Sequence, residues 1–285
     1  MTHDISIVIR CSNDKRIYDC LKSIGTRVGE ILVVLNYPTP EVENIVRNFG
    51  CRVVKVNSRN IALLQNRGVE AARFEKILLM DSDCIFGPGT IDKIATALDK
   101  HKVVRGQLVY IERDSVIPDV IQRFRNFIGA RIDIAHTPLL GIRKSIKNDI
   151  GGYYYDESIL WSEDFEMHLR LVEAGVEIYG IPNARAFNQR NSFWREMKGA
   201  MQYGIGGSLI DKKRKEPLLY IRKNSWIKFG NAWRQQGILT ALYYQFFYYP
   251  FYLLGYLRER LNPITEKNRE SVAASDNFFK RFFVS

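Results

Sequence analysis

The stretch KILLMDSDCIFGPG (residues 76–89) places two aspartates, Asp81 and Asp83, directly after an apolar run. A short apolar run closed by Gly-Pro-Gly is typical of a buried strand that ends in a turn. An unpaired carboxylate is costly in such a place, so it is normally paired or bound to a cation. Because ligands of open α/β sheets bind beyond the carboxyl ends of the strands, the two aspartates are candidates for a ligand site. The alternative is an ordinary strand-end turn, in which Asp and Ser are common.

Strands and helices are expected to alternate around this stretch. Short β-branched runs predict strands, and apolar residues spaced three and four apart predict helices. The short links between them indicate an α/β fold, with a Rossmann-like and mostly parallel sheet covered by helices on both faces. The expected strands are 5–10, 30–36, 51–56 and 76–81, and the expected helices are 14–26, 40–50, 61–72 and 90–100.

The pattern changes after about residue 102. A helix that starts after Ser162 has a Ser N-cap, acidic residues in its first turn and a closing glycine. We expect a domain over 1–208, with halves 1–102 and 103–208, and a basic, aromatic helical extension over 209–285. The further expected strands are 103–112 and 176–182, the extended segment is 137–145, and the further helices are 118–131, 162–175 and 192–208.

The charge of the 285-residue chain is unevenly distributed. The net charge is +11, and the whole excess lies after residue 184, where 18 Lys and Arg residues stand against 7 Asp and Glu residues. A basic surface attracts anions such as lipid headgroups, nucleic acids or phosphorylated substrates. The alternative is a solvated surface without a partner.

The four cysteines show no spacing typical of a zinc site. Cys11 and Cys84 fall beside expected strands, where buried free thiols are common. The N-terminus shows no signal-peptide pattern, so we expect a cytoplasmic protein without a disulfide framework.

Three motifs then occur in a characteristic order: MDSD (80–83), GGYYYDE (151–157) and EDFEMHLRLVEAG (163–175). Together with the order of strands and helices, they resemble the inverting family-two glycosyltransferases with the GT-A fold, from about residue 5 to about residue 208. The resemblance implies a nucleotide-sugar-binding half (1–102), an acceptor half (103–208) and an enzyme that moves a sugar from a nucleotide-diphosphate donor.

The resemblance also implies roles for individual residues. Asp83, Asp81 and Asn188 are expected to hold Mn²⁺ or Mg²⁺, because hard cations prefer oxygen ligands. Asp164, with Glu163 beside it, is expected to be the general base. The alternative for these two acids is a favourable interaction with the helix dipole only. The expected donor-binding residues are Arg10, Ser12, Asn13, Asn36, Asn66, Arg67, Asp81 and Ser82, and the expected acceptor-binding residues are Trp161, Trp194 and Arg195.

The chain departs from the family pattern at three places. The loop after the first strand reads RCSND, and Leu35-Asn36 replaces an acidic pair after the second strand. An amide both donates and accepts hydrogen bonds, so Asn36 could still read a nucleotide base, but the identity of that base stays open. Asn188 stands where the family often has a histidine that reaches the metal.

The extension contains ILTALYYQFFYYPFYLLGYL (238–257), 20 residues without a charge. Its length allows a membrane span, but Pro250 and the centrally placed tyrosines argue against one. We expect peripheral contact of 211–261 with the cytoplasmic face of a membrane, aided by the basic run 211–216. A glycan or a polyprenyl-linked glycan is then the expected acceptor. The alternative is that these helices cover the catalytic domain or form a homodimer contact.

Two function classes other than a glycosyltransferase remain as alternatives, a sugar-phosphate nucleotidyltransferase and a non-enzymatic anion-binding module. A sugar-phosphate nucleotidyltransferase would use a similar sheet, but RCSND lacks the glycines expected after its first strand. A non-enzymatic anion-binding module would explain the charge but not the four acids of the two motifs. No helix-turn-helix, RNP or zinc signature indicates a nucleic-acid partner.

Overall fold

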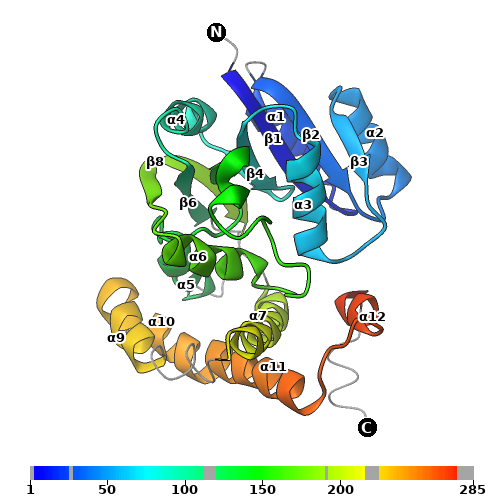
Figure 1. Ribbon diagram of the computed structural model, residues 1–285. Helices are drawn as coiled ribbons and strands as arrows, with labels where there is room; N and C mark the ends of the chain where they lie inside the picture. The colour runs from blue at the N-terminus through cyan, green and yellow to red at the C-terminus, as the bar shows by residue number, and fades with distance from the viewer. Residues whose placement is uncertain (1–2, 26–27, 112–119, 190–191, 216–224, 275–285) are drawn as a thin grey trace.

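The computed structural model describes residues 3–25, 28–111, 120–189, 192–215 and 225–274. Figure 1 shows a twisted sheet with helices on both faces and a further layer of helices on one side of it. This architecture confirms the expected α/β fold with a mostly parallel sheet. Residues 26, 112, 118–119 and 216 of the expected segments lie outside the described residues, as do 217–224 and 275–285 of the extension.

The described strands form one sheet of eight strands in the order β3-β2-β1-β4-β7-β6-β8-β5. Pairing is parallel from β3 to β4 and between β6 and β8, whereas β7 and β5 pair antiparallel to their neighbours. The strands are β1 (His3–Cys11), β2 (Val28–Leu35), β3 (Arg52–Lys55), β4 (Lys76–Asp81), β5 (Cys84–Phe86), β6 (Val103–Ile111), β7 (Leu140–Arg143) and β8 (Ile178–Gln189).

Alternate residues of β1 build the cores on the two faces of this sheet. Ile7 and Ile9 pack in one core with α1, α2 and α4, and Val8 packs in the other with α3 and α6. Two of these helices start with side-chain caps: Thr39 accepts from Val42 N, and Asn60 accepts from Leu63 N. The helices of this part are α1 (Ile17–Ile24), α2 (Pro40–Asn48), α3 (Ile61–Ala71), α4 (Thr90–Ala97), α5 (Val120–Gly129) and α6 (Glu163–Glu173), with a 3₁₀ turn at Lys144–Asn148.

The acceptor half differs from the sequence expectation in its strands. The extended segment expected at 137–145 contains β7, which inserts between β4 and β6. The last strand, β8, continues to Gln189 instead of ending near residue 182, since a register shift at Gly106/Gln107 lets it follow β6 along its whole length. The short strand β5, which directly follows Asp83, pairs with the end of β8. These pairings bring Asn188 next to the Asp-Ser-Asp turn.

Helix α7 (Phe193–Arg214) is continuous across the expected boundary at residue 208. It is followed by α9 (Ser225–Gln236), α10 (Ile238–Tyr243), a π-helical turn (Tyr244–Tyr248), α11 (Tyr249–Leu261) and α12 (Arg269–Ala274). Helices α7 and α11 pack so closely that a Cβ atom at Gly204 would lie 2.0 Å from the carbonyl oxygen of Tyr252. Glycine at this position therefore permits the contact. None of the described helices combines the length and apolar character needed to span a membrane.

Candidate active site

An arginine–aspartate pair closes the carboxyl ends of the two central strands. Strands β1 and β4 are parallel neighbours, and their register places Arg10 opposite Asp81. The guanidinium donates twice to the carboxylate, from Nε to Oδ1 at 2.8 Å and from Nη2 to Oδ2 at 3.0 Å. Burial raises the pKa of Asp81, while the charge of Arg10 opposes the shift. Both oxygens of Asp81 are therefore engaged by protein.

Asp83 lies two residues further along, with looser contacts. Its Oδ2 is 3.4 Å from Nη2 of Arg16, and that arginine is held in turn by Asp14, whose Oδ1 accepts from Nε at 2.9 Å. Its Oδ1 accepts from Sγ of Cys84 at 3.5 Å, and these two long contacts leave oxygen lone pairs of Asp83 for a ligand. Of the two aspartates in the turn, Asp83 is thus the better placed to bind a cation.

Asn188 lies on β8, opposite Cys84 of β5. Its Oδ1 is buried and accepts no hydrogen bond in the described part of the chain. A buried amide oxygen without a partner costs about 1–3 kcal/mol, so this oxygen has the capacity for one more ligand.

The other half of the site is the start of α6. Two residues with positive φ, Trp161 (53°) and Ser162 (141°), lead into this helix. Ser162 was expected to cap the helix through its side chain, but it makes no such bond. Its backbone N–H instead donates to Oε2 of Glu163 at 3.1 Å, because its positive φ is incompatible with ordinary N-cap geometry. Strained backbone thus presents the two acids.

Glu163 and Asp164 lie in different electrostatic surroundings. Glu163 is 5% exposed and accepts from Nε2 of Gln65 at 3.3 Å, and its burial, together with the charge of Asp164, raises its pKa to about 7. Burial would also raise the pKa of Asp164, but His136 and two backbone amides lower it below the ordinary value. These donors are His136 Nδ1 at 3.3 Å, Thr137 N at 3.2 Å and Phe165 N at 2.8 Å.

The strand ends and the helix start meet at a seam. A pocket of about 10 Å³ is lined by Arg10, Gln65 and Thr137 together with apolar side chains. Arg10 contacts Asp81, whereas Gln65 and Thr137 contact the two acids of α6. The pocket has room for about one water molecule, so it is a seam beside the site and not the donor cleft. The charge of Asp164 also acts on Asp81, so the two acidic motifs lie close together.

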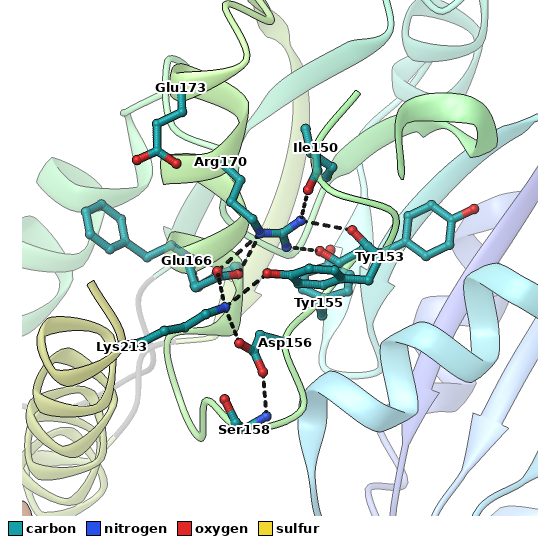
Figure 2. A network of polar contacts seen from close by, with 12 residues as sticks. Ile150, Tyr153, Tyr155, Asp156, Ser158, Glu166, Arg170, Glu173 and Lys213 are labelled. Carbon is teal, nitrogen blue, oxygen red and sulfur yellow. Dashed lines mark hydrogen bonds and ion pairs between the residues drawn. The ribbon is translucent and has the colours of Figure 1, made fainter. Parts of the chain in front are cut away.

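The Gly-Gly-aromatic motif is fixed in place by an ionic network, shown in Figure 2. Lys213 of α7 donates to Tyr153 Oη at 3.0 Å, to Glu166 at 3.0 Å and to Asp156. Arg170 of α6 pairs with Glu166 at 3.0 Å and lies over the Tyr153 ring at 3.9 Å. Three elements, the 151–157 loop, α6 and α7, are therefore connected, and the start of α6 has a rigid support.

The residues expected to bind the donor lie in different parts of the site. Ser12 and Asn36 follow β1 and β2, whose ends are joined by a bond from Asn36 N to Cys11 O at 3.0 Å. In contrast, the amide of buried Asn66 donates to Glu157 at 3.0 Å and exchanges hydrogen bonds with the Tyr155 backbone. Asn66 thus fixes the 151–157 loop, and its donor-binding role stays a prediction. Of the others, Asn13 is exposed in the loop after β1, Ser82 is buried between the two aspartates, and Arg67 is exposed and 3.5 Å from Glu70.

The residues expected to bind the acceptor lie around the start of α7 and α6. Trp161 directly precedes Ser162 and is half-buried, whereas Trp194 is 66% exposed at the first turn of α7. Arg195 is exposed and its charge reaches the β1–α1 loop: burial would raise the pKa of Asp14, but Arg16 and Arg195 lower it.

Two residues of the site were missed by the sequence analysis. His136 was left without a role, because its contact with Asp164 arises only from the fold. Arg105 of β6 is 2% exposed, donates to the carbonyls of Gly106 (2.6 Å) and Leu139 (3.2 Å), and is influenced by the charge of Asp164. Its burial lowers its pKa to about 10. An arginine inside the apolar run VVRGQL was a usable signal, since buried arginines are rare.

Comparison with known proteins supports the resemblance to glycosyltransferases. Residues 6–146 match the family described as Glycosyl transferase family 2. No curated protein matches the sequence. Among solved structures, S. aureus TarS 1–349 is similar with a TM-score of 0.52, in a crystal structure at 16% identity and in one with UDP-GlcNAc at 14%, each covering 92% of both chains.

Another crystal structure of S. aureus TarS matches with a TM-score of 0.51 at 16% identity. The match covers 79% of this chain and only 45% of that TarS chain, so this chain spans less than half of its length. At such identities the structural likeness establishes the fold, and the family match adds the enzyme class. Residues 6–146 therefore belong to a glycosyltransferase domain of family two, and its fold is GT-A.

Proposed function

We propose that this chain transfers a sugar from a nucleotide-diphosphate donor to a hydroxyl group, with inversion at the anomeric carbon. One arrangement carries the proposal: Glu163 and Asp164 at the start of α6 face the strand ends that hold Asp81 and Asp83. One acidic motif can thus act on the acceptor while the other side of the site holds the diphosphate. A single displacement needs this separation of roles.

Asp164 is the proposed general base. The acceptor oxygen attacks the anomeric carbon, its proton passes to a carboxylate oxygen of Asp164, and the bond to the diphosphate breaks with its electron pair on the leaving group. A base must be ionised and within reach of its substrate. The side chain of Asp164 is 18% exposed and its pKa is lowered, whereas Glu163 is 5% exposed with a pKa of about 7. These differences favour Asp164.

His136 is proposed as a positioning residue for this base. Its Nδ1 lies 3.3 Å from Oδ2 of Asp164, and the adjacent Thr137 amide donates to the same oxygen. Phe165 N binds the other oxygen. The carboxylate is thereby held in one orientation and kept ionised.

A divalent cation, Mn²⁺ or Mg²⁺, fits the donor side. Asp83 and Asn188 would hold it, since the contacts of Asp83 with Arg16 and Cys84 are long, and the buried Asn188 oxygen has no hydrogen-bond partner among the described residues. No three His, Cys, Asp or Glu side chains gather into a metal cluster within the described ranges, so water and the diphosphate would complete the set. When bound, the cation would neutralise charge on the departing diphosphate.

The donor and acceptor are proposed by class only. Because TarS has been crystallised with UDP-GlcNAc, a UDP-sugar is the first donor to test, with Asn36 as the residue that reads the base. A glycan or polyprenyl-linked glycan is the proposed acceptor, contacting Trp161, Trp194 and Arg195. The cytoplasmic location expected from the sequence stays a prediction.

The test is a thermal-shift panel with UDP, GDP, CDP and dTDP, each with and without Mn²⁺. At a ligand concentration of about 100 Kd, binding stabilises the native state by about 2.7 kcal/mol, which raises Tm by roughly 5–10 °C for a chain of this size. We expect such a shift for one nucleotide, dependent on Mn²⁺, and its loss in Asp83→Asn.

Asp4→Asn is the matched control, because Asp4 is an exposed aspartate at the start of β1, at the opposite end of this strand from the candidate site. This variant should keep the full shift. If no nucleotide raises Tm in wild type, the donor site is assigned wrongly, and if Asp83→Asn responds like wild type, the role of Asp83 is refuted.

A further inference from the structure

The helical segment 238–261 exposes large apolar side chains that a surface in contact only with water would not be expected to carry. Exposed leucine and phenylalanine side chains follow one another at spacings of 3, 4, 8, 3 and 4 along α10, the π-helical turn and α11. Their exposed fractions range from 36% to 85%. We name this row of side chains the Leu–Phe ridge, which consists of Leu239, Leu242, Phe246, Leu254, Leu257 and Leu261.

The opposite side of the same helices buries tyrosines. Five of them are at most 8% exposed and pack towards the rest of the protein: Tyr243, Tyr244, Tyr248, Tyr252 and Tyr256. Tyr256 donates to Asp211 of α7 at 2.8 Å, and Tyr244 stacks on Phe124 of α5. The residues with a polar group thus face inward, and the purely hydrocarbon residues face outward. A helix that met only solvent would show the reverse distribution.

The ridge is long and lies at the edge of the molecule. It covers 23 residues from Leu239 to Leu261, which corresponds to about 34 Å of helix at 1.5 Å per residue. Figure 1 shows α9, α10 and α11 as the layer farthest from the sheet. Two exposed tryptophans, Trp194 (66%) and Trp233 (54%), belong to α7 and α9 of the same region. Such a large apolar surface is typical of an interaction site.

Charge distinguishes between possible partners. Residues 225–261 carry four basic residues, Lys228, Arg234, Arg258 and Arg260. Their single acid, Glu259, is fully buried and bonded to Lys212 at 2.9 Å. The segment therefore carries a net positive charge, which is suited to an anionic surface.

The basic run 211–216 at the end of α7 was expected to add to this charge, but three of its cations are engaged in ion pairs. Lys212 pairs with Glu259, Lys213 with Glu166 and Asp156, and Arg214 with Glu173. These cations stabilise contacts inside the protein. The proposed attraction to an anionic surface is therefore assigned mainly to the cations of 225–261.

We infer that the Leu–Phe ridge docks on the surface of an anionic phospholipid bilayer, with α10 and α11 lying in the plane of the interface. A protein interface contains about one hydrogen bond per 100–200 Å², yet the ridge itself presents only Leu and Phe. Hydrocarbon side chains inserting at the headgroup boundary and nearby cations are what an interfacial helix requires. The inference rests on this helical face and not on the proposed enzymatic reaction.

The test is co-sedimentation of the whole chain with vesicles, in the absence of any donor or acceptor. Vesicles of phosphatidylglycerol and phosphatidylcholine in a 3:7 ratio, or about 30% anionic lipid, present the charged surface. We expect wild type to bind, and Phe246→Glu and Leu257→Glu each to bind about tenfold more weakly, since each loses apolar insertion and adds repulsion. Both residues are exposed, so these variants should keep the Tm of wild type.

Val172→Glu is the matched control, because Val172 is 60% exposed on α6, outside the ridge, and the change in charge is the same. It should bind like wild type. The inference is overturned if wild type does not sediment with these vesicles at low salt, or if Val172→Glu weakens binding as much as the ridge variants. It is also overturned if size-exclusion chromatography shows a dimer that the ridge variants convert to monomer, without vesicle binding.

Discussion

The charge of Asp164 depends on a histidine from the loop before β7. Burial alone would raise the pKa of Asp164, and the net lowering comes from His136 and backbone amides. A general base acts only when it is deprotonated, so its pKa sets the acid limb of the pH–rate profile. His136→Gln keeps a hydrogen-bonding side chain but removes the imidazole that lowers the pKa of Asp164. The pKa of Asp164 should then rise, and the acid limb of kcat/KM should move to higher pH.

The measurement compares kcat/KM for wild type and His136→Gln between about pH 3 and pH 8, because the pKa of Asp164 lies below the ordinary aspartate value of about 3.9. A rise of one unit in the pKa of Asp164 corresponds to about a tenfold loss on the acid side, with little change at pH 8. His101→Gln serves as a control, since His101 stacks on Tyr179 away from the site. An equal loss at every pH would mean that His136 has only a structural role, and an unchanged profile would refute its link to Asp164.

At the level of single elements, the nucleotide-binding half was the more predictable. Strands β1, β2 and β4 are buried on both faces, so each reads as an apolar run in the sequence. Strands β5 and β7 contain three and four residues, too few for any periodic signal. The second half of β8 was missed because several of its residues are polar and exposed, and only pairing with β6 makes it a strand.

The same limit applies to the site. The Asp-Ser-Asp turn and the Glu-Asp helix start were found from local pattern and resemblance, and the structure brings them to one seam. The contact between His136 and Asp164 and the burial of Arg105 depend on how distant segments pack. The positive φ of Ser162 is likewise imposed by its surroundings, since a serine before acidic residues normally predicts an ordinary cap. Tertiary contacts of this kind leave no local signal.

Helix α7 supports the start of α6 through a glycine. A Cβ atom at Gly206 would lie 1.7 Å from the carbonyl oxygen of Trp161, which is backbone and cannot move aside as a side chain would. Gly206→Ala should therefore displace the Trp161–Ser162 turn. We expect a loss of about 1–3 kcal/mol in the free energy of unfolding, measured by urea denaturation, together with a loss of transferase activity.

Gly230→Ala is the control for this change. Gly230 lies inside helix α9, and a Cβ atom there would meet nothing within 4 Å. Alanine at such a position should be neutral or stabilise by roughly 0.4–1 kcal/mol, because it restricts the unfolded chain. Equal stability of the Gly206→Ala variant and wild type would show that α7 and the turn can separate without cost.

At the scale of the molecule, α7 links the candidate active site to the Leu–Phe ridge. Through Gly206 and Lys213 it contacts the Trp161–Ser162 turn and Glu166, and through Gly204 and Lys212 it contacts α11. A membrane contact of the ridge would therefore be mechanically connected to the start of α6. It would also bring the site close to a lipid surface, where a polyprenyl-linked acceptor would be found.

The balance between the two forces at this surface can be measured through salt. Attraction between exposed charges is screened over about 10 Å at 0.1 M ionic strength and about 3 Å at 1 M, whereas insertion of leucine and phenylalanine side chains does not depend on screening. The cations of 225–261 should thus give a salt-sensitive part of vesicle binding, and the ridge a salt-resistant part.

Wild type should lose about tenfold or more in affinity for 3:7 phosphatidylglycerol–phosphatidylcholine vesicles between roughly 0.05 and 0.5 M NaCl and then reach a plateau. Arg234→Gln, which removes an exposed cation, should lower the low-salt affinity but not the plateau, and Leu257→Glu should lower the plateau. Binding that vanishes completely in high salt would mean that the Leu–Phe ridge does not enter the bilayer.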